Sequence, residues 1–160
     1  MKNLMKNTAL VVASVFLALA FASHDAKSEY KPVPQKTVAK KDRNGRWISA
    51  GHVERGIASY YNKASVRPYP GKGYLTANGK RFDDKADTAA HRSLPFGTVV
   101  KVTDIKTGRW VIVRINDRGP YVEGRIIDLT EGAAEKIGIA GKKGLAKVKM
   151  EVIRFSDKTS

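Results

Sequence analysis

The sequence predicts a mainly β-stranded protein in which several short strands close into one small barrel. From Gly56 onward, apolar and β-branched residues occur in short segments that glycines and prolines separate, a pattern typical of short strands. Only one segment has a clear helical pattern. Closure into a barrel removes the unpaired edges that so small a sheet would otherwise expose.

The clearest pair of strands forms a hairpin. Residues 98–104 and 109–116 are rich in Val and Ile. They flank Lys106-Thr107-Gly108, whose glycine suits the positive φ of a tight turn. Trp110 lies on the second of these strands, and we expect its ring to be buried in the core.

Two more strands bound the domain. Residues 146–154 alternate strictly between apolar and charged side chains, which is typical of a half-buried strand. The side chains expected to face the core are Val148, Met150 and Val152. Residues 56–61 are expected to form the first strand, before a long loop over 62–75 that is rich in Pro and Gly.

Helix is scarce in the predicted domain. Residues 130–137 are the best candidate, with Thr130 as N-cap and Gly138 as the residue that ends the helix. A short helical turn over residues 87–90 is a second candidate. The sequence therefore predicts an all-β protein with one or two short helices.

The first 22 residues have the pattern of an export signal. Lys2 and Lys6 precede an apolar run over residues 8–22, which ends in Ala20-Phe21-Ala22, so cleavage before Ser23 is expected. The alternative is an uncleaved membrane anchor. The sequence favours cleavage, because the run is shorter than the roughly 20 residues of a comfortable span and polar residues follow at once. No integral membrane segment is expected after cleavage.

Beyond the signal, the sequence predicts one folded domain. Residues 23–52 are polar and rich in Lys, so they are expected to form a disordered basic linker. Residues 53–155 form the barrel domain, and 156–160 form a tail. The chain contains no cysteine, which excludes disulfides and a lipid anchor on cysteine. The expectation is a soluble monomer, exported to a periplasm or to the extracellular space.

The formal net charge is +15, which favours anionic partners. The basic residues are spread along the chain rather than gathered in one stripe with interleaved aromatics, so nucleic acid is not expected and anionic polymers of the cell wall fit better. The histidines His24, His52 and His91 do not fall at ligand spacing, and neither a metal nor another cofactor is expected.

Five short motifs follow one another in the predicted domain. They are TANGKRFD (76–83), TAAH (88–91), LPFGT (94–98), VRINDRGP (113–120) and GRIIDLT (124–130). In this order and spacing they resemble the RlpA family (rare lipoprotein A, septal-ring lytic transglycosylases) over about residues 56–152. The resemblance implies a six-stranded double-psi β-barrel, a fold shared with expansins. It also implies that peptidoglycan glycan strands are the partner and substrate.

Lytic transglycosylases cleave a glycosidic bond without water. One carboxyl protonates the leaving oxygen and then, as a carboxylate, takes a proton from the muramic acid 6-hydroxyl, which closes a 1,6-anhydro ring. Such an acid must be protonated near neutral pH, which burial or a negative neighbour favours. A single carboxyl performing both steps differs from the paired carboxylates of ordinary glycosidases.

Asp117 and Asp128 are the candidate carboxyls. Asp128 lies among apolar residues, and by resemblance it matches the catalytic aspartate of related barrel enzymes. Asp117 follows the most apolar strand and matches an aspartate implicated in the RlpA family. Either one is alternatively an aspartate that braces a loop. His91 also matches a family position, where it either tunes a carboxylate or serves as a structural histidine.

Several other residues are candidates for substrate binding. Aromatic rings suit sugar faces, and amides and cations suit acetamido groups and carboxylates. These candidates are Tyr60, Asn78, Lys80, Arg118, Tyr121 and Arg125.

Lys80 departs from the family pattern, in which Glu commonly follows Thr-Ala-Asn-Gly. A lysine near a carboxyl lowers the pKa of that carboxyl and disfavours its acid form. Alternatives therefore stay open. One is a lytic transglycosylase that uses Asp117 or Asp128. Another is a non-catalytic, expansin-like module that binds peptidoglycan, and a third is a protein that docks on another envelope component.

Overall fold

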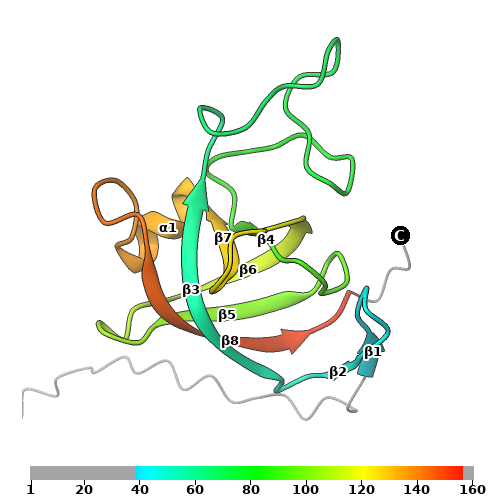
Figure 1. Cartoon of the computed structure of the whole chain (residues 1–160), viewed down its shortest axis with the longest axis vertical. Coiled ribbons are helices and arrows are strands. Elements are labelled where there is room, and N and C mark those ends of the chain that lie inside the picture. The colour runs from blue at the N-terminus through cyan, green and yellow to red at the C-terminus, as the bar shows by residue number, and fades with distance from the viewer. Residues whose placement is uncertain (1–38, 157–160) are drawn as a thin grey trace, which may run out of the picture. The chain divides into compact units, whose positions relative to one another are not determined.

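The computed structural model describes residues 39–156 (Figure 1). The predicted signal over residues 1–22, the predicted linker as far as residue 38 and residues 157–160 lie outside this range. Within residues 39–156, no helix has the length and apolar character needed to cross a membrane. The same residues contain no group of three His, Asp or Glu side chains arranged to hold a metal ion.

Six strands close into a barrel in the order β3-β7-β4-β6-β5-β8. The strands are β1 (Ala39–Lys41), β2 (Trp47–Ser49), β3 (Val53–Tyr61), β4 (Thr88–Ala90), β5 (Val99–Asp104), β6 (Trp110–Asp117), β7 (Arg125–Thr130) and β8 (Ala146–Arg154). The pairs β3–β7 and β4–β6 are parallel, and the other barrel pairs are antiparallel. The predicted mainly β fold with a six-stranded double-psi barrel is confirmed.

The core fills the inside of the barrel with aliphatic side chains. On β6 and β8 every second residue points inward, as the pleat of a strand requires. The expected alternation of β8 is confirmed, and the predicted hairpin is the antiparallel pair β5–β6. The fully buried barrel side chains include Val100, Val102, Val113, Ile115, Ile127, Leu129, Val148, Met150 and Val152.

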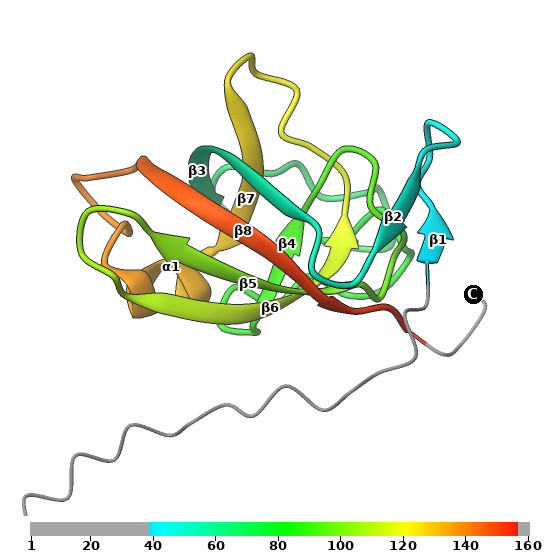
Figure 2. The same ribbon diagram turned by 90° about the horizontal axis from the view of Figure 1, so that it is seen from below.

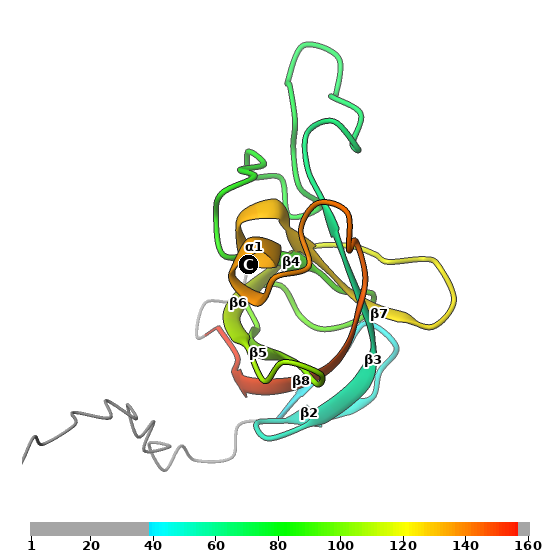
Figure 3. The same cartoon turned by 90° about the vertical axis from the view of Figure 1, so that its left-hand side faces the viewer.

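The helix α1 (Glu131–Ile137) covers one end of the barrel and lies nearest the viewer in Figure 3. Ala133, Ala134 and Ile137 bury its apolar side in the core. Gly138 ends the helix in the left-handed conformation, as predicted. Thr130 is the N-cap by position, but its hydroxyl donates instead to the carbonyls of Ala86 and Thr88, at 2.5 and 3.2 Å. It thus ties β7 to the start of β4.

The predicted helical turn over residues 87–90 is wrong, because this segment forms β4. Ala89 and Ala90 pair with β6 on one side and with β7 on the other. Pairing on both sides of the segment outweighs the local helical preference of consecutive alanines.

The expected burial of Trp110 is also wrong, since 53% of its surface is exposed. In β6 the residues that point inward are Val111, Val113 and Ile115, so Trp110 points outward. The ammonium group of Lys101 on β5 lies 4.6 Å from the centroid of its ring, a cation–π contact that shields one part of the ring.

The predicted disordered linker is wrong for residues 39–52, because β1 and β2 form a hairpin within it. Ile48 of β2 is only 1% exposed and belongs to the core. The carboxylate of Asp42 accepts the backbone N–H groups of Asn44 and Arg46, both at 2.9 Å, which fixes the turn. In Figure 2 the hairpin lies at the end of the barrel away from α1. Two large apolar residues, Trp47 and Ile48, among many charged ones were too weak a signal for this element.

If the hairpin is part of the folded domain, Ile48→Ala will lower the free energy of unfolding by about 2–4 kcal/mol, because it removes a fully buried side chain. Trp47 on the same strand is 66% exposed, so Trp47→Ala is a matched control with an expected cost below about 1 kcal/mol. Urea denaturation of both variants tests this expectation. Equal stability of Ile48→Ala and the unaltered protein would contradict it.

Candidate active site

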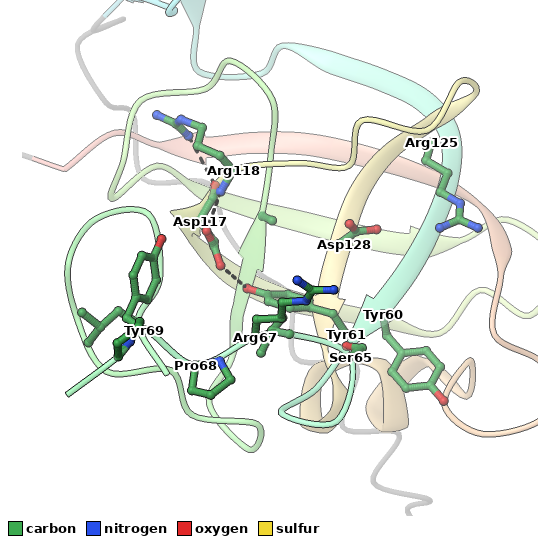
Figure 4. A pocket seen from close by; sticks show the side chains of 14 residues that line it. Tyr60, Tyr61, Ser65, Arg67, Pro68, Tyr69, Asp117, Arg118, Arg125 and Asp128 are labelled. Carbon is green, nitrogen blue, oxygen red and sulfur yellow. Dashed lines mark hydrogen bonds between the residues drawn. The ribbon is translucent and has the colours of Figure 1, made fainter. Parts of the chain in front are cut away.

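A groove of about 600 Å³ opens at the ends of β3 and β6 and beside β7, beneath the long loop over residues 62–75 (Figure 4). In Figure 1 this loop rises beyond the tip of β3. Asp117 is the last residue of β6, Asp128 lies within β7, and the loop supplies one wall. The groove is lined by Tyr60, Tyr61, Ser65, Val66, Arg67, Pro68, Tyr69, Pro70, Leu75, Ala90, Asp117, Arg118, Arg125 and Asp128.

Strand β4 determines the spacing of the two carboxyls. Ala90 pairs with Asp117 of β6 on one side and with Asp128 of β7 on the other. Neighbouring strands lie about 4.8 Å apart, so the backbones of the two aspartates are roughly 10 Å apart across β4. Ala90 itself lines the groove and is almost fully buried. Its small side chain leaves the space between the carboxyls open.

Asp117 accepts three hydrogen bonds from the protein. The backbone N–H groups of Ala77 and Arg118 donate to Oδ1, at 2.9 and 2.8 Å. The hydroxyl of Tyr61 donates to Oδ2 at 3.2 Å, as the dashed line in Figure 4 shows. The carboxyl of Asp117 therefore holds together the end of β3, the turn at residues 76–80 and its own loop.

Asp128 has a different environment. Burial raises the pKa of its carboxyl, and the charge of Asp117 contributes in the same direction. A hydrogen bond that the Ser59 hydroxyl donates to Oδ1, together with the charge of Arg125, opposes this rise. The resulting pKa lies above the ordinary value for aspartate. Burial is the largest of these effects, as is typical of a carboxyl that acts as an acid.

Gly119 brings the loop after β6 close to Asp128. Its φ of +127° is a conformation that other residues rarely adopt, and a Cβ added there would lie 3.7 Å from Oδ2 of Asp128. A side chain at this position would thus both strain the loop and contact the carboxyl. The glycine of the VRINDRGP motif keeps this face of Asp128 free.

Tyr61 is a groove residue that the sequence analysis missed. Its ring stacks on Phe82, with 4.9 Å between the centroids, and its hydroxyl contacts Asp117. Burial and the charge of Asp117 raise the pKa of Tyr61, so it stays a neutral donor. The sequence carries no local signal for this role, because the contact joins residues 56 positions apart.

The loop over residues 62–75 also contributes residues that were missed. Arg67 and Tyr69 line the groove, and Figure 4 shows the guanidinium group of Arg67 directed toward the middle of the pocket. Backbone hydrogen bonds join Tyr69 and Gly73 within the loop. The N–H of Lys63 also donates to the carboxylate of Asp84, so the loop is held in place at both points. The unusual length of the loop was the one available signal.

Three of the predicted substrate-binding residues reach the groove. Tyr60 and Arg125 line it at the end away from Asp117 (Figure 4). Arg118 lines it as well, but its guanidinium group stacks on Phe96 at 3.7 Å from the ring centroid and donates to the carbonyl of His91 at 3.2 Å. Arg118 therefore supports the loops around Asp117.

His91 is buried and lies outside the groove lining. Its Nδ1 accepts the N–H groups of Ser93 and Leu94, at 3.2 and 3.0 Å. Its Nε2 lies 3.5 Å from Oε2 of Glu54, and this contact is the main reason that the pKa of Glu54 falls to about 2. The backbone N–H of His91 donates to the carbonyl of Asp117. These contacts fix the loop beside Asp117, while the imidazole faces Glu54.

The remaining candidates also lie outside the groove lining. Oδ1 of Asn78 accepts the Thr76 hydroxyl at 2.7 Å and the Lys80 N–H at 3.3 Å, which shapes the turn whose Ala77 N–H binds Asp117. The side chains of Lys80 and Tyr121 are exposed. Lys80 therefore belongs to the turn that supports Asp117.

Comparison with protein families matches residues 53–150 to the family described as lytic transglycolase. The probable endolytic peptidoglycan transglycosylase RlpA of Nostoc sp. is 52% identical over 102 residues, which cover 62% of this chain and 25% of that protein. The endolytic peptidoglycan transglycosylase RlpA of Vibrio cholerae is 41% identical over 142 residues, which cover 84% of this chain and 51% of that protein. The chain thus spans a quarter to about half of these relatives.

Among solved structures, the Streptomyces papain inhibitor is 21% identical with a TM-score of 0.48, over 66% of this chain and 97% of that one. An expansin from Clavibacter michiganensis is 22% identical with a TM-score of 0.44, over 68% of this chain and 53% of that one.

The residues matched by the family model include the barrel strands β3 to β7 and both carboxyls of the groove. They also include all five motifs that carry the resemblance to RlpA proteins. That resemblance is confirmed, and the chain belongs to the lytic transglycolase family.

Proposed function

We propose that this chain is a peptidoglycan lytic transglycosylase that cleaves glycan strands and leaves 1,6-anhydro-muramic ends. The observation that carries the proposal is Asp128, a carboxyl in an open groove whose pKa burial raises above its ordinary value. The names of the RlpA relatives, endolytic peptidoglycan transglycosylases, support the same reaction.

Asp128 acts first as an acid and then as a base. Its proton goes to the glycosidic oxygen as the bond from that oxygen to C1 of muramic acid breaks. The carboxylate left behind then takes the proton of the 6-hydroxyl, whose oxygen bonds to C1 and closes the anhydro ring. The proton given in the first step returns in the second, so one carboxyl suffices and water is not consumed. A pKa above the ordinary value favours the first step.

Asp117 assists this reaction through its charge and its position. The charge of Asp117 contributes to the raised pKa of Asp128, and a fixed negative group stabilises the positive charge that develops at C1. Tyr61 and two backbone N–H groups hold the carboxyl in place without movement during the reaction. His91 and Arg118 position the loops around it.

The proposal includes export from the cytoplasm, since peptidoglycan lies outside it. Its support is the signal pattern over residues 1–22 and the net charge of +15, which suits anionic wall polymers. Soluble export as a monomer belongs to the same proposal.

A second candidate is a module that binds peptidoglycan without cutting it. The cations of the groove favour this function, because Arg67, Arg118 and Arg125 all line it and the charge of Arg125 lowers the pKa of Asp128. Such a site attracts an anionic glycan whether or not it cleaves the strand.

Substitution of the acid distinguishes the two functions. On peptide-free glycan strands, Asp128→Asn is expected to reduce the formation of anhydro-muramic ends at least about 100-fold, the usual loss on removal of a general acid. Asp117→Asn should reduce it less, because that residue assists and does not transfer the proton. Mass analysis of the digested strands measures both.

Asp83→Asn, at an exposed carboxyl outside the groove lining, is the control and should match the unaltered protein. Full activity of Asp128→Asn would overturn the assignment of the acid. If all forms are inert but still sediment with purified sacculi, the binding module is the correct function.

The pH dependence of kcat/KM should shift in opposite directions in two variants. A general acid must be protonated, so activity falls as pH rises through the pKa of Asp128. Ser59→Ala removes a hydrogen bond that lowers this pKa. The alkaline limb, which is the part of the profile where kcat/KM falls as pH rises, should therefore move to higher pH. Asp117→Asn removes a negative charge that raises it, so the limb should move to lower pH.

Rates on peptide-free strands across the pH range measure this effect. Ser93→Ala removes another buried serine hydroxyl, one that contacts Asp42, and should leave the limb in place. Shifts of both variants in one direction would show that Asp128 does not set the limb.

A further inference from the structure

A second surface, on the side of the barrel away from the groove, exposes three apolar side chains. Ile105, Trp110 and Ile112 are 55%, 53% and 37% exposed. Trp110 and Ile112 point outward from β6, and Ile105 follows the end of β5 in the turn that joins the two strands. In Figures 1 and 3 the loop over residues 62–75 rises from one side of the barrel, and β5 and β8 lie on the opposite side.

Strand pairing places lysines among these apolar side chains. Lys101 points outward from β5, and its ammonium group lies 4.6 Å from the centroid of the Trp110 ring. Lys147 and Lys149 point outward from β8, which pairs with β5. The N–H of Ile105 donates to the carbonyl of Lys147 at 3.0 Å, so this lysine lies beside the apolar group. The outer face, as we call this surface, consists of Lys101, Ile105, Trp110, Ile112, Lys147 and Lys149.

The outer face is positively charged. Glu151 is the only acidic residue of β8, and its carboxylate lies 3.6 Å from the ammonium group of Lys149. Asp104 at the end of β5 is buried and paired with Lys143 at 2.8 Å, so its charge does not face solvent. The three lysines of the outer face therefore outweigh the single acid beside them.

This combination suits the interface of an anionic lipid bilayer. Tryptophan is favoured at the level of the lipid headgroups, and nearby lysines attract headgroups of negative charge. An anionic polymer would engage the lysines but leave the three apolar side chains in water. The outside of a closed barrel is convex, so it offers no hollow for a small ligand. A fluid lipid surface adapts to a convex face and takes up both kinds of side chain.

We infer that the outer face binds reversibly to the surface of an anionic phospholipid membrane, with Trp110 and the two isoleucines among the headgroups. No residue of the outer face lines the groove. The long loop over the groove rises from the opposite side of the barrel (Figure 1), so binding in this orientation directs the groove away from the bilayer. Lipid binding does not depend on the proposed reaction, because it uses no residue of the groove.

The chain has two tryptophans, which allow a direct test. Trp47 is 66% exposed and has the ammonium group of Lys41 at 5.3 Å from its ring centroid. It therefore resembles Trp110 in its surroundings but lies on the β1–β2 hairpin. Trp47→Phe leaves Trp110 as the only tryptophan, and Trp110→Phe leaves Trp47. The full chain is used throughout, so any contribution from the rest of the chain is common to both variants.

Each variant is titrated with vesicles of equal parts phosphatidylglycerol and phosphatidylcholine while its tryptophan fluorescence is recorded. The emission of Trp110 should shift to shorter wavelength, and lipids with brominated acyl chains should quench it, because the ring leaves water for the lipid interface. The emission of Trp47 should stay unchanged. Vesicles of phosphatidylcholine alone should shift neither, since they carry no net charge.

Sedimentation with the same vesicles measures the affinity. Trp110→Ala should weaken binding about tenfold, because it removes the largest apolar side chain of the outer face. Lys147→Gln should weaken binding roughly fivefold, the effect of one lysine near an anionic surface. Trp47→Ala and Lys72→Gln are the matched controls, since Lys72 is an exposed lysine of the long loop on the opposite side. Both controls should bind as the unaltered protein does.

An unchanged Trp110 emission on the anionic vesicles would overturn the inference. Equal shifts of Trp47 and Trp110 would also overturn it, because the outer face would then not direct the binding. If Lys147→Gln weakens binding but Trp110→Ala does not, and inorganic polyphosphate competes fully with the vesicles, the lysines serve an anionic polymer and the inference fails. Absence of anhydro-muramic ends, by contrast, would contradict only the proposed reaction.

Discussion

The arrangement of the groove depends on the pairing of one short strand. β4 lies between β6 and β7, and Ala90 is the residue opposite both Asp117 and Asp128. A register slip of β6 or β7 by one residue would turn its carboxyl to the other face of the sheet. The parallel pairing of β3 with β7 adds Ser59 beside Asp128 in the same way. The backbone pairing of the barrel strands thus fixes the positions of Ser59, Asp117 and Asp128 relative to one another.

The two aspartates show how one groove gives identical side chains different properties. Asp117 accepts hydrogen bonds from three donors and thereby links the end of β3 to two loops. Asp128 is held by one hydroxyl and is otherwise partly withdrawn from water, so burial dominates its pKa. The charge of Arg125 works against that effect, and under the proposed function the arginines of the groove also attract an anionic glycan. If the proposed function is correct, Arg125 helps to attract the glycan but also opposes the raised pKa that the acid needs.

Local patterns predicted part of this structure well. The alternation of β8, the β5–β6 hairpin and the end of α1 at Gly138 follow from short-range preferences, and these predictions agree with the structure. β4 was missed because Thr88–Ala90 becomes a strand only through partners on both sides. The β1–β2 hairpin was missed because a single residue, Ile48, anchors it in the core.

The candidate site was predicted mainly where the motifs carry it, with Tyr60 of the first barrel strand as the exception. Asp117, Asp128, Arg118, Arg125 and Tyr60 all reach the groove. Tyr61 and Arg67 were missed because their place depends on the path of a loop and on contacts with distant residues. The burial of Trp110 was wrongly expected because the composition of its strand is typical of a core strand. The inward residues of β6 are Val111, Val113 and Ile115, so the side chain of Trp110 lies on the opposite face of the strand.

The β1–β2 hairpin has a consequence for the path of the chain. The ammonium group of Lys40 donates to the carbonyl of Ser156 at 2.6 Å, so the first and last described residues of the domain are neighbours. A short linker could therefore join residue 156 to residue 39, and closing so short a loop would cost little conformational entropy. The domain is therefore suited to circular permutation, with new ends in the β5–β6 turn and the groove left intact.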